Sequence, residues 1–338
     1  MTEKHVTLAH GSGGERMQHL ITEVVCKYFD DPILARLDDA ALLDNIRSDE
    51  RLALSTDGFV VQPVEFPGGD IGKLAVCGTV NDLAMMGGRP IALSVALILE
   101  EGLEMVLLER ILKSMRTAAR QARIPIVCGD TKVVNRGNCD KIFITTSGIA
   151  AVARHYKIGA AQARAGDAVI LSGTIAEHEV AVLNARESLG LMPPPRTDCA
   201  ALNSLVSRML AAGGERIHVL RDPTRGGVAT VLNEISRASR VGIEIDERYV
   251  PLKAVTRAAC ELLGLDPLYL ACEGRLVAFV AAGKAEQVLK AMHCHPLGTK
   301  AAIVGSVAAG HRQVILKTTA GSRRMLDMLV HEQMPRIC

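Results

Sequence analysis

Acidic side chains set among small residues are the first groups in this sequence whose type and spacing could do chemistry. Each lies at an expected turn or strand end: Asp38, Asp39, Asp57, Asp82 and Asp130. A single Asp at such a place is a common turn former. Mg²⁺, however, prefers hard oxygen ligands and usually bridges carboxylates to phosphates. Because these residues share one half of the chain with a glycine-rich loop, they predict a site for magnesium and a nucleotide.

The glycine-rich loop is His10-Gly11-Ser12-Gly13-Gly14, and a helix is expected to follow it. Glycines allow backbone N–H groups to approach a ligand closely, and a helix N-terminus favours an anion. A flexible N-terminal turn is an equally good interpretation of these residues alone. Lys132 follows Asp130 by two positions and could hold a phosphate as a point charge.

The segment Phe66–Lys73 superficially resembles a phosphate-binding P-loop. Gly68 and the Gly72-Lys73 pair are one residue too close together for a P-loop, and Leu74 stands where that motif requires Ser or Thr. We therefore exclude a Walker-type NTPase and expect a turn that opens a helix over residues 71–86. Asn81 and Asp82 are unusual polar residues inside that helix, and either a packing role or a ligand role would explain them.

The segment Arg221–Gly227 places a carboxylate, a hydroxyl and two guanidinium groups before an expected helix, through Asp222, Thr224 and Arg225 among others. Arginine is suited to bidentate phosphate binding, so we favour a functional role over a helix cap with surface charges. Glu273, before a later strand, is by itself an ordinary residue.

The nine cysteines form no Cys-x-x-Cys pair, and their number is odd. This pattern argues against a disulfide framework and against a zinc ribbon. The ninth is Cys338, the last residue, whose thiol can enter a narrow site head-first. A frayed tail with an incidental thiol is the alternative. The run His293-Cys294-His295 is a weak candidate for metal binding, because no partner pair is evident.

Composition narrows the classes of function. The chain has 338 residues, 49% hydrophobic and 22% charged, as in ordinary globular proteins. Lys and Arg number 39 against 37 Asp and Glu, and aromatic residues make up 3%. We therefore expect no nucleic-acid partner. The absence of an apolar run of about 20 residues or a signal peptide, together with free thiols, predicts a cytoplasmic protein that does not cross a membrane.

Short β-branched runs alternate with segments of helical periodicity, which predicts an α/β or α+β architecture. Strands are expected over residues 52–55, 91–99, 124–128, 141–149, 168–172, 275–281, 301–307 and 313–316. Helices are expected over residues 14–29, 71–86, 104–122, 175–189, 198–212, 226–239, 252–263, 285–292 and 323–329.

We expect three segments in the chain. Residues 1–155 would form an N-terminal domain for ATP binding and dimerisation, and residues 156–310 a C-terminal α/β domain. Residues 311–338 would form a C-terminal segment that ends in a mobile tail carrying Cys338.

These motifs together closely resemble those of the HypE family, the carbamoyl dehydratases of NiFe-hydrogenase maturation. The matching strings are residues 10–14, 38–40, 55–57, 66–73, 78–82, 129–133, 221–227, 273–274 and 335–338. Several are shared with the wider superfamily of aminoimidazole ribonucleotide synthetase, selenophosphate synthetase and thiamine-monophosphate kinase. The terminal Pro-Arg-Ile-Cys at residues 335–338 singles out the HypE family.

The resemblance implies a two-domain fold like that of aminoimidazole ribonucleotide synthetase, with the N-terminal sheet forming a homodimer and ATP bound near that interface. The residues assigned to Mg²⁺ are Asp39, Asp57, Asp82, Asp130 and Asp222. The residues assigned to ATP are Gly11, Ser12, Gly13, Gly14, Asp57, Lys73, Asn81, Asp130, Lys132, Thr224 and Arg225.

The resemblance also implies that the substrate is the chain's own Cys338, carbamoylated by the transferase HypF. Dehydration of the S-carbamoyl group needs its oxygen made into a leaving group, and attack on the ATP γ-phosphate achieves this. The resulting S-cyanide would supply the cyanide ligands of iron held by the HypC–HypD scaffold. The expected catalytic groups are the thiol of Cys338, Glu273 as base and Lys132 for charge stabilisation.

Two other functions remain open on sequence grounds. One is a different ATP-dependent enzyme of the same superfamily that acts on a small free substrate. The other is a non-catalytic scaffold or metal-delivery protein that uses Cys338 and residues 293–295.

Overall fold

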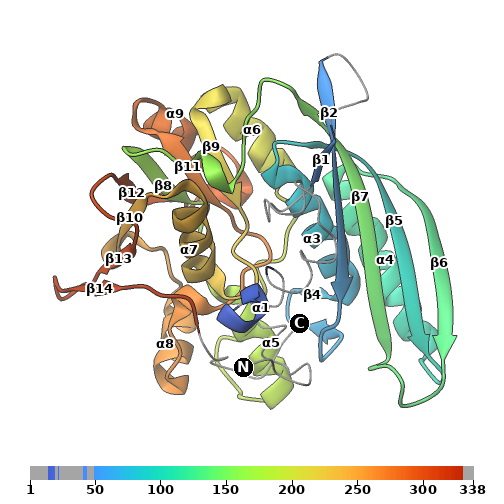
Figure 1. The fold of residues 1–338 in the computed structure, drawn as a ribbon. Helices are drawn as coiled ribbons and strands as arrows, with labels where there is room; N and C mark the ends of the chain where they lie inside the picture. The colour runs from blue at the N-terminus through green and yellow to red at the C-terminus, as the bar shows by residue number, and fades with distance from the viewer. Residues whose placement is uncertain (1–13, 20–21, 23–40, 44–48, 330–338) are drawn as a thin grey trace.

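The computed structural model describes residues 14–19, 22, 41–43 and 49–329 (Figure 1). The first part of the chain builds a five-stranded sheet in the order β1-β2-β7-β5-β6. These strands are β1 (Ala41–Leu43), β2 (Glu50–Phe59), β5 (Arg89–Glu100), β6 (Ile126–Val134) and β7 (Ile142–Ala153). All neighbours are antiparallel except β5 and β6, whose crossover runs through α4 (Met105–Ala122).

Helices α3 (Ile71–Met85) and α4 cover one face of this sheet, while the described residues place no helix on the outer face (Figure 1). Helix α3 also contacts the second part of the chain, so it is enclosed on several sides. Every residue of α3 is buried except Lys73 and Asp82. An apolar helix without a polar face is typical of such a central position.

The segment that resembles a P-loop forms a tight hairpin before α3. Strands β3 (Glu65–Phe66) and β4 (Gly69–Asp70) pair with each other, and the Asp70 carboxylate caps the helix by accepting the Lys73 N–H at 2.9 Å. A side-chain acceptor at this position satisfies one of the unpaired N–H groups at a helix start. The expectation of a turn that opens a helix is confirmed.

The second part builds a seven-stranded sheet in the order β14-β13-β10-β12-β8-β11-β9. Its strands are β8 (Asp167–Leu171), β9 (Ile217–Arg221), β10 (Gly242–Asp246), β11 (Val277–Ala281), β12 (Ala302–Ala308), β13 (Val314–Lys317) and β14 (Arg323–Met325). The helices are α5 (Glu177–Glu187), α6 (Asn203–Gly213), α7 (Gly227–Ser239), α8 (Ala254–Leu263) and α9 (Ala282–His293). Short 3₁₀ turns are η4 (Ala160–Gln162), η5 (Gly214–Arg216), η6 (Glu247–Tyr249), η7 (Pro267–Tyr269) and η8 (Pro296–Gly298).

Most expected elements agree with the structure. The short strands β1, β3 and β4 were not expected, and further differences lie in the second sheet. The helix expected over 104–122 is α4, which ends at Arg123 in the left-handed conformation. The expected helix over 323–329 is wrong, because residues 323–325 form β14 and pair with β13. Strands β9 and β10 were not expected at all. Both join the sheet by pairing with strands distant in the chain.

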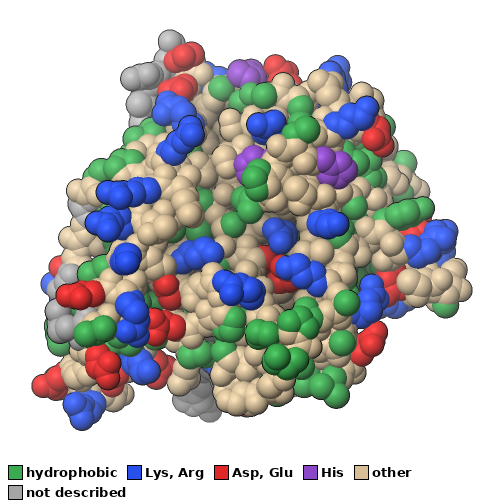
Figure 2. Space-filling model, turned by 180° about the vertical axis from the view of Figure 1, so that it is seen from behind, with side chains coloured by type: hydrophobic (Ala, Val, Ile, Leu, Met, Phe, Trp, Pro, Cys, Tyr) green, Lys and Arg blue, Asp and Glu red, His purple; other side chains and the backbone are tan. Residues whose placement is uncertain are grey.

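Charge is unevenly spread over the surface. Seen from behind, Lys and Arg side chains gather across the middle of the molecule, with few acidic side chains among them (Figure 2). Among the described residues, no helix is both long and apolar enough to span a membrane.

Two glycines at the second position of a helix offer a matched test of the packing between α3 and α4. A Cβ at Gly72 would lie 2.6 Å from Met115 Cγ and 2.7 Å from Ile111 O, whereas a Cβ at Gly283 in α9 meets nothing within 4 Å. We expect Gly72→Ala to lower the free energy of unfolding by about 1–3 kcal/mol. Gly283→Ala should leave it unchanged or raise it by about 0.5–1 kcal/mol. Urea unfolding of both variants measures this, and equal effects would contradict the packing described.

Candidate active site

Two strand residues and one helix turn build the first half of the site. Ser55 and Asp57 are two positions apart on β2, so both point toward α3. Thr79 donates a hydrogen bond to Asp57 Oδ2 at 2.8 Å, and Ser55 donates to Asp82 Oδ2 at 2.5 Å. A further hydrogen bond links the carboxyl groups of Asp57 and Asp82. Burial raises the pKa of Asp57 above its ordinary value despite these hydrogen bonds.

The second half of the site comes from the turn between β9 and α7. Asp222 is buried, Arg225 is exposed, and Gly226 and Gly227 both have positive φ values of 74° and 61°. This backbone suits glycine, and the chain turns sharply from the strand into α7. Burial raises the pKa of Asp222 to about 6, partly opposed by the charge of Arg221.

Glu273 joins the two halves. Its side chain is buried, and burial raises its pKa well above the ordinary value, with the negative charges of Asp222, Asp198 and Asp57 acting in the same direction. The charge of Arg225 opposes this rise. We call Asp57, Asp82, Asp222 and Glu273 the acid cluster, with Arg225 as its cationic neighbour.

Carboxyl groups held close together in a buried place resist ionisation, because their negative charges repel each other and lose contact with water. A bound cation would offset this cost by stabilising the ionised carboxylates, so the acid cluster is a suitable place for one. The described residues contain no group of three or more Asp, Glu, His or Cys side chains already arranged to hold a metal ion. This agrees with the usual behaviour of Mg²⁺, which takes one or two carboxylates and completes its shell with phosphate and water.

Asp130 lies elsewhere on the sheet. Asp57 pairs with Thr146, which pairs with Val95, which in turn pairs with Gly129, so these four residues share the inner face. Asp130 is one position further along β6 and therefore lies on the opposite face, three strands from Asp57. Within one chain the structure does not bring Asp130 and Asp57 to a common ion.

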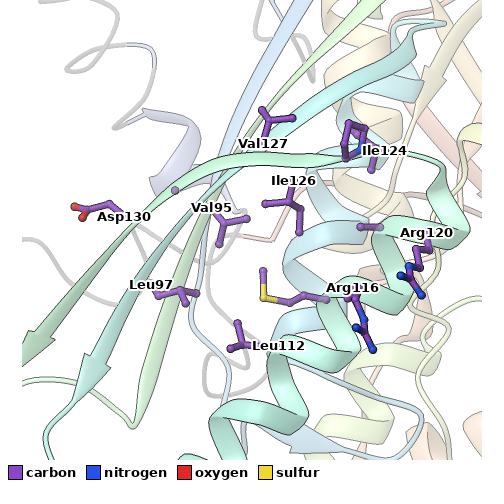
Figure 3. A pocket seen from close by; sticks show the side chains of 13 residues that line it. Val95, Leu97, Leu112, Arg116, Arg120, Ile124, Ile126, Val127 and Asp130 are labelled. Atoms are coloured by element: carbon purple, nitrogen blue, oxygen red, sulfur yellow. The ribbon is translucent and has the colours of Figure 1, made fainter.

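Lys132 lies on the same strand, and its Nζ is 3.1 Å from Asp130 Oδ2, with both side chains exposed. Beside them a groove of about 800 Å³ runs between α4 and the strands β5 and β6. Its lining is mainly apolar, with Arg116 and Arg120 on the α4 side and Asp130 at the far end (Figure 3). The groove is separate from the acid cluster.

The other residues expected to bind ATP have varied positions. Lys73 Nζ donates to Gly68 O at 3.0 Å within the hairpin, and Asn81 is fully buried. Thr224 is half-buried beside Asp222. Gly14 directly precedes α1 (Glu15–His19). The other loop residues, Gly11, Ser12 and Gly13, lie outside the described residues, as do Asp39 and Cys338.

The histidine run is occupied by local contacts. His293 Nε2 lies 2.9 Å from Ala301 O, and His295 Nε2 lies 3.1 Å from Ser204 Oγ. These contacts give the two rings ordinary structural roles at the end of α9.

Sequence reasoning did not single out Thr79 or Asp198 as parts of the site. Thr79 lies three residues before Asp82 on the same side of α3, a spacing that could have indicated it. Asp198 has no local signal, because its contacts with Glu273 and Arg275 cross about 75 residues of chain.

Removing one carboxylate from the acid cluster should stabilise the free protein. The pKa of Asp222 is about 6 in the folded state, against about 3.9 in an unfolded chain. The folded state therefore binds more protons between these values, and stability falls as pH rises from about 4 to 6. We expect Asp222→Asn to be more stable than the wild type by about 1–3 kcal/mol at neutral pH and equal near pH ~4. Urea unfolding at both pH values tests this; a difference independent of pH would contradict it.

Comparisons with known proteins assign the chain to a family. The family model for AIR synthase related protein, N-terminal domain, matches residues 37–152, and that for the C-terminal domain matches residues 164–317. The carbamoyl dehydratase HypE of Rhodobacter capsulatus is 48% identical over 342 aligned positions, covering 100% of this chain and 99% of the relative. The Escherichia coli K12 carbamoyl dehydratase HypE is 47% identical, covering 99% of each.

The chain belongs to the HypE family of carbamoyl dehydratases. Solved structures agree. HypE in a HypE–HypF complex superposes with a TM-score of 0.87 at 46% identity, covering 92% of this chain and 99% of that one. HypE in complex with ATP superposes with a TM-score of 0.82 at 46% identity, covering 99% and 100%. The resemblance expected from the sequence is confirmed.

The fold itself is shared beyond this family. Thiamine monophosphate kinase from Aquifex aeolicus matches with a TM-score of 0.66 at 20% identity, covering 89% of this chain and 96% of that one. The predicted two-domain architecture like that of aminoimidazole ribonucleotide synthetase is therefore confirmed.

Proposed function

We propose that this member of the HypE family uses ATP to dehydrate an S-carbamoyl group on its own Cys338 to S-cyanide. The observation that supports this best is the acid cluster, which joins Asp57 and Asp82 of the first sheet unit to Asp222 and Glu273 of the second. A site of this composition can hold a metal-bound triphosphate beside a buried carboxyl of raised pKa, the two requirements of the reaction.

ATP would bind across the acid cluster, as a HypE relative is described in complex with ATP. Asp57, Asp82 and Asp222 are the candidate carboxylates, of which one or two would hold each Mg²⁺ together with phosphate and water; the ion would supply positive charge for the phosphates. Arg225 and the turn at Gly226–Gly227 would face the phosphates from the second sheet unit. The Gly11–Gly14 loop would cover them from the N-terminal side.

The reaction makes one bond to phosphorus and then removes the oxygen from carbon. The carbamoyl oxygen attacks the γ-phosphorus, ADP leaves, and loss of one N–H proton gives an S-imidate phosphate. Removal of the second N–H proton then forms the C≡N bond as phosphate departs with the oxygen. Glu273 would take a proton from nitrogen, and its raised pKa makes it a stronger base than an ordinary glutamate.

The last described residues of the chain run beside α7, the helix that starts at the acid cluster. Asn233 in α7 donates to Leu326 O at 2.7 Å, and Tyr269 OH donates to Asp327 O at 2.8 Å. Glu15 N–H at the start of α1 donates to Leu329 O at 2.9 Å. The point from which the chain continues to Cys338 is therefore fixed between α1 and α7.

Intact-mass analysis of the C-terminal peptide tests the proposal. The protein is incubated with a carbamoyl transferase of the HypF type, carbamoyl phosphate and ATP, and the mass of Cys338 is followed with time. We expect the carbamoyl mass first and the lighter nitrile mass afterwards, the second step only when ATP is present. A carbamoylated peptide that never loses water, with ATP bound, would overturn the proposal.

The partners follow from the same proposal. A relative is described in a HypE–HypF complex, so a HypF-type transferase is the expected donor of the carbamoyl group. A HypC–HypD iron scaffold would receive the cyanide. The cytoplasm stays the predicted compartment, since a reducing environment keeps the Cys338 thiol free.

We also propose that the outer face of the first sheet forms a homodimer. Leu54 is 43% exposed on that face, and Ile149 lies near it on β7. Asp130 and Lys132 also lie on this face, so dimerisation would bring them to the interface. We expect Leu54→Arg to convert a dimer to a monomer in sedimentation velocity, and a wild-type protein that sediments as a monomer would contradict the proposal.

A further inference from the structure

Asn81 does not point into the acid cluster, although Asp82, the next residue, does. Successive residues of a helix point about 100° apart. Asp82 therefore meets Ser55 on β2, while Asn81 points to the second part of the chain. Asn81 is 1% exposed, and its polar atoms reach partners more than 100 residues away in sequence.

The side-chain amide of Asn81 is nearly saturated by backbone groups. Its Nδ2 donates to Ala200 O at 3.1 Å and to Glu273 O at 3.2 Å, and its Oδ1 accepts the Leu202 N–H at 2.8 Å. An amide nitrogen has only two protons to donate. Both are used here, so the carboxamide has no donor left for a nucleotide.

The backbone of Glu273 is held on both sides. Asp198 Oδ1 accepts the Glu273 N–H at 3.1 Å, and the Glu273 carbonyl accepts from Asn81 Nδ2 and from the Ala200 N–H. A Cβ on Gly274 would lie 1.9 Å from Asp198 O, so the next residue packs directly against that backbone. Asn81 ties this arrangement to α3, which also carries Asp82.

We propose that Asn81 is a positioning residue, whose carboxamide fixes the backbone of Glu273 relative to Asp82 and the other carboxyl groups of the acid cluster. The inference rests on the proposed function, in which Glu273 is the base. One helix would thus hold the two reacting parts in register, Asp82 on the phosphate side and Asn81 on the base side. Small displacements of a base can lower a rate by about 100-fold.

Two variants of Asn81 separate positioning from nucleotide binding. Asn81→Asp keeps an oxygen for the Leu202 N–H but replaces the NH₂ donor by a carboxyl oxygen that faces two carbonyl oxygens. Asn81→Ala removes all three hydrogen bonds. Asn203→Ala is the matched control, because Asn203 Nδ2 also crosses between the two units, donating to Ala122 O at 2.8 Å, away from Glu273.

The first measurement is a single turnover of carbamoylated protein, together with ATP affinity by equilibrium binding. For Asn81→Asp we expect a dehydration rate lower by about 10–100-fold and an ATP Kd within about twofold of the wild type. Asn203→Ala should match the wild type. An ATP affinity that falls in parallel with the rate, or an unchanged rate, would overturn the inference.

Amide hydrogen exchange keeps this result independent of the proposed function. In both Asn81 variants the peptide that contains Glu273 should exchange faster than in the wild type, and in Asn203→Ala it should not. If the wild type makes no cyanide, the proposed function fails by itself. Unchanged exchange at Glu273 in the Asn81 variants would overturn the positioning role whatever the wild type does.

Discussion

Replacing Cys338 by Ser should abolish formation of S-cyanide while leaving ATP binding unchanged. The proposed reaction needs sulfur at this position, because the thiolate accepts the carbamoyl group and a serine hydroxyl is a far weaker nucleophile. The acid cluster, in contrast, is built entirely from other residues. We expect no carbamoyl and no nitrile mass on the C-terminal peptide, and an ATP Kd within about twofold of the wild type, a difference of about 0.4 kcal/mol.

The matched control is Cys294→Ser, since Cys294 is an exposed free thiol at the end of α9. This variant should be carbamoylated and dehydrated like the wild type. The pair also separates the proposed function from an enzyme that acts on a small free substrate. Such an enzyme would keep its product after loss of Cys338, and that result would contradict a self-modifying reaction.

The second large effect is expected for Glu273→Gln, which keeps the shape of the side chain and removes its basicity. The hydrogen bonds that hold this residue involve its backbone, so the variant should retain the surrounding structure. Carbamoylation of Cys338 should proceed, and dehydration should slow by about 10²–10⁴-fold, the usual contribution of a positioned general base. Carbamoylated protein should therefore accumulate in the mass spectrum.

The pH profile gives an independent check on this assignment. A base acts in its deprotonated form, and the pKa of Glu273 is raised by burial and by neighbouring carboxylates. The wild-type dehydration rate should therefore rise with pH, with a midpoint well above the pKa of an ordinary glutamate. In Glu273→Gln this rise of the rate with pH should disappear. Glu65→Gln, at an exposed ion pair with Arg110, serves as control. A Glu273→Gln variant that dehydrates at the wild-type rate would show that another group removes the proton.

Local sequence signals predicted the parts of the molecule that depend on neighbouring residues. Helix α4 follows from its apolar spacing, and the glycine spacing of residues 66–73 excludes a P-loop and leaves a turn that opens α3. Strands β9 and β10 were missed because their conformation is set by pairing with strands distant in the chain. The helix expected over 323–329 is wrong for a more local reason: Gly321, at φ 86°, turns the chain back so that β14 forms a hairpin with β13, the preceding strand.

The same distinction applies to the site. Asp57, Asp82, Asp222 and Glu273 could be selected because their motifs are compact and resemble those of a known family. The orientation of Asn81 could not be predicted from the sequence, because its three backbone partners lie between 119 and 192 residues away. An amide inside an apolar helix indicates that some polar partner exists, but only the packed structure shows which one.

The fixed position of Leu329 has a kinetic consequence. Cys338 is the ninth residue after Leu329, so the thiol stays within about 30 Å of that point whatever the path of the chain. One thiol confined to a sphere of that radius has an effective concentration on the order of 10 mM, whatever the concentration of the protein. Dehydration should then be first-order and independent of protein concentration. A transferase or an iron scaffold must bring its own reactive centre within the same radius, which limits where on this molecule either of them can dock.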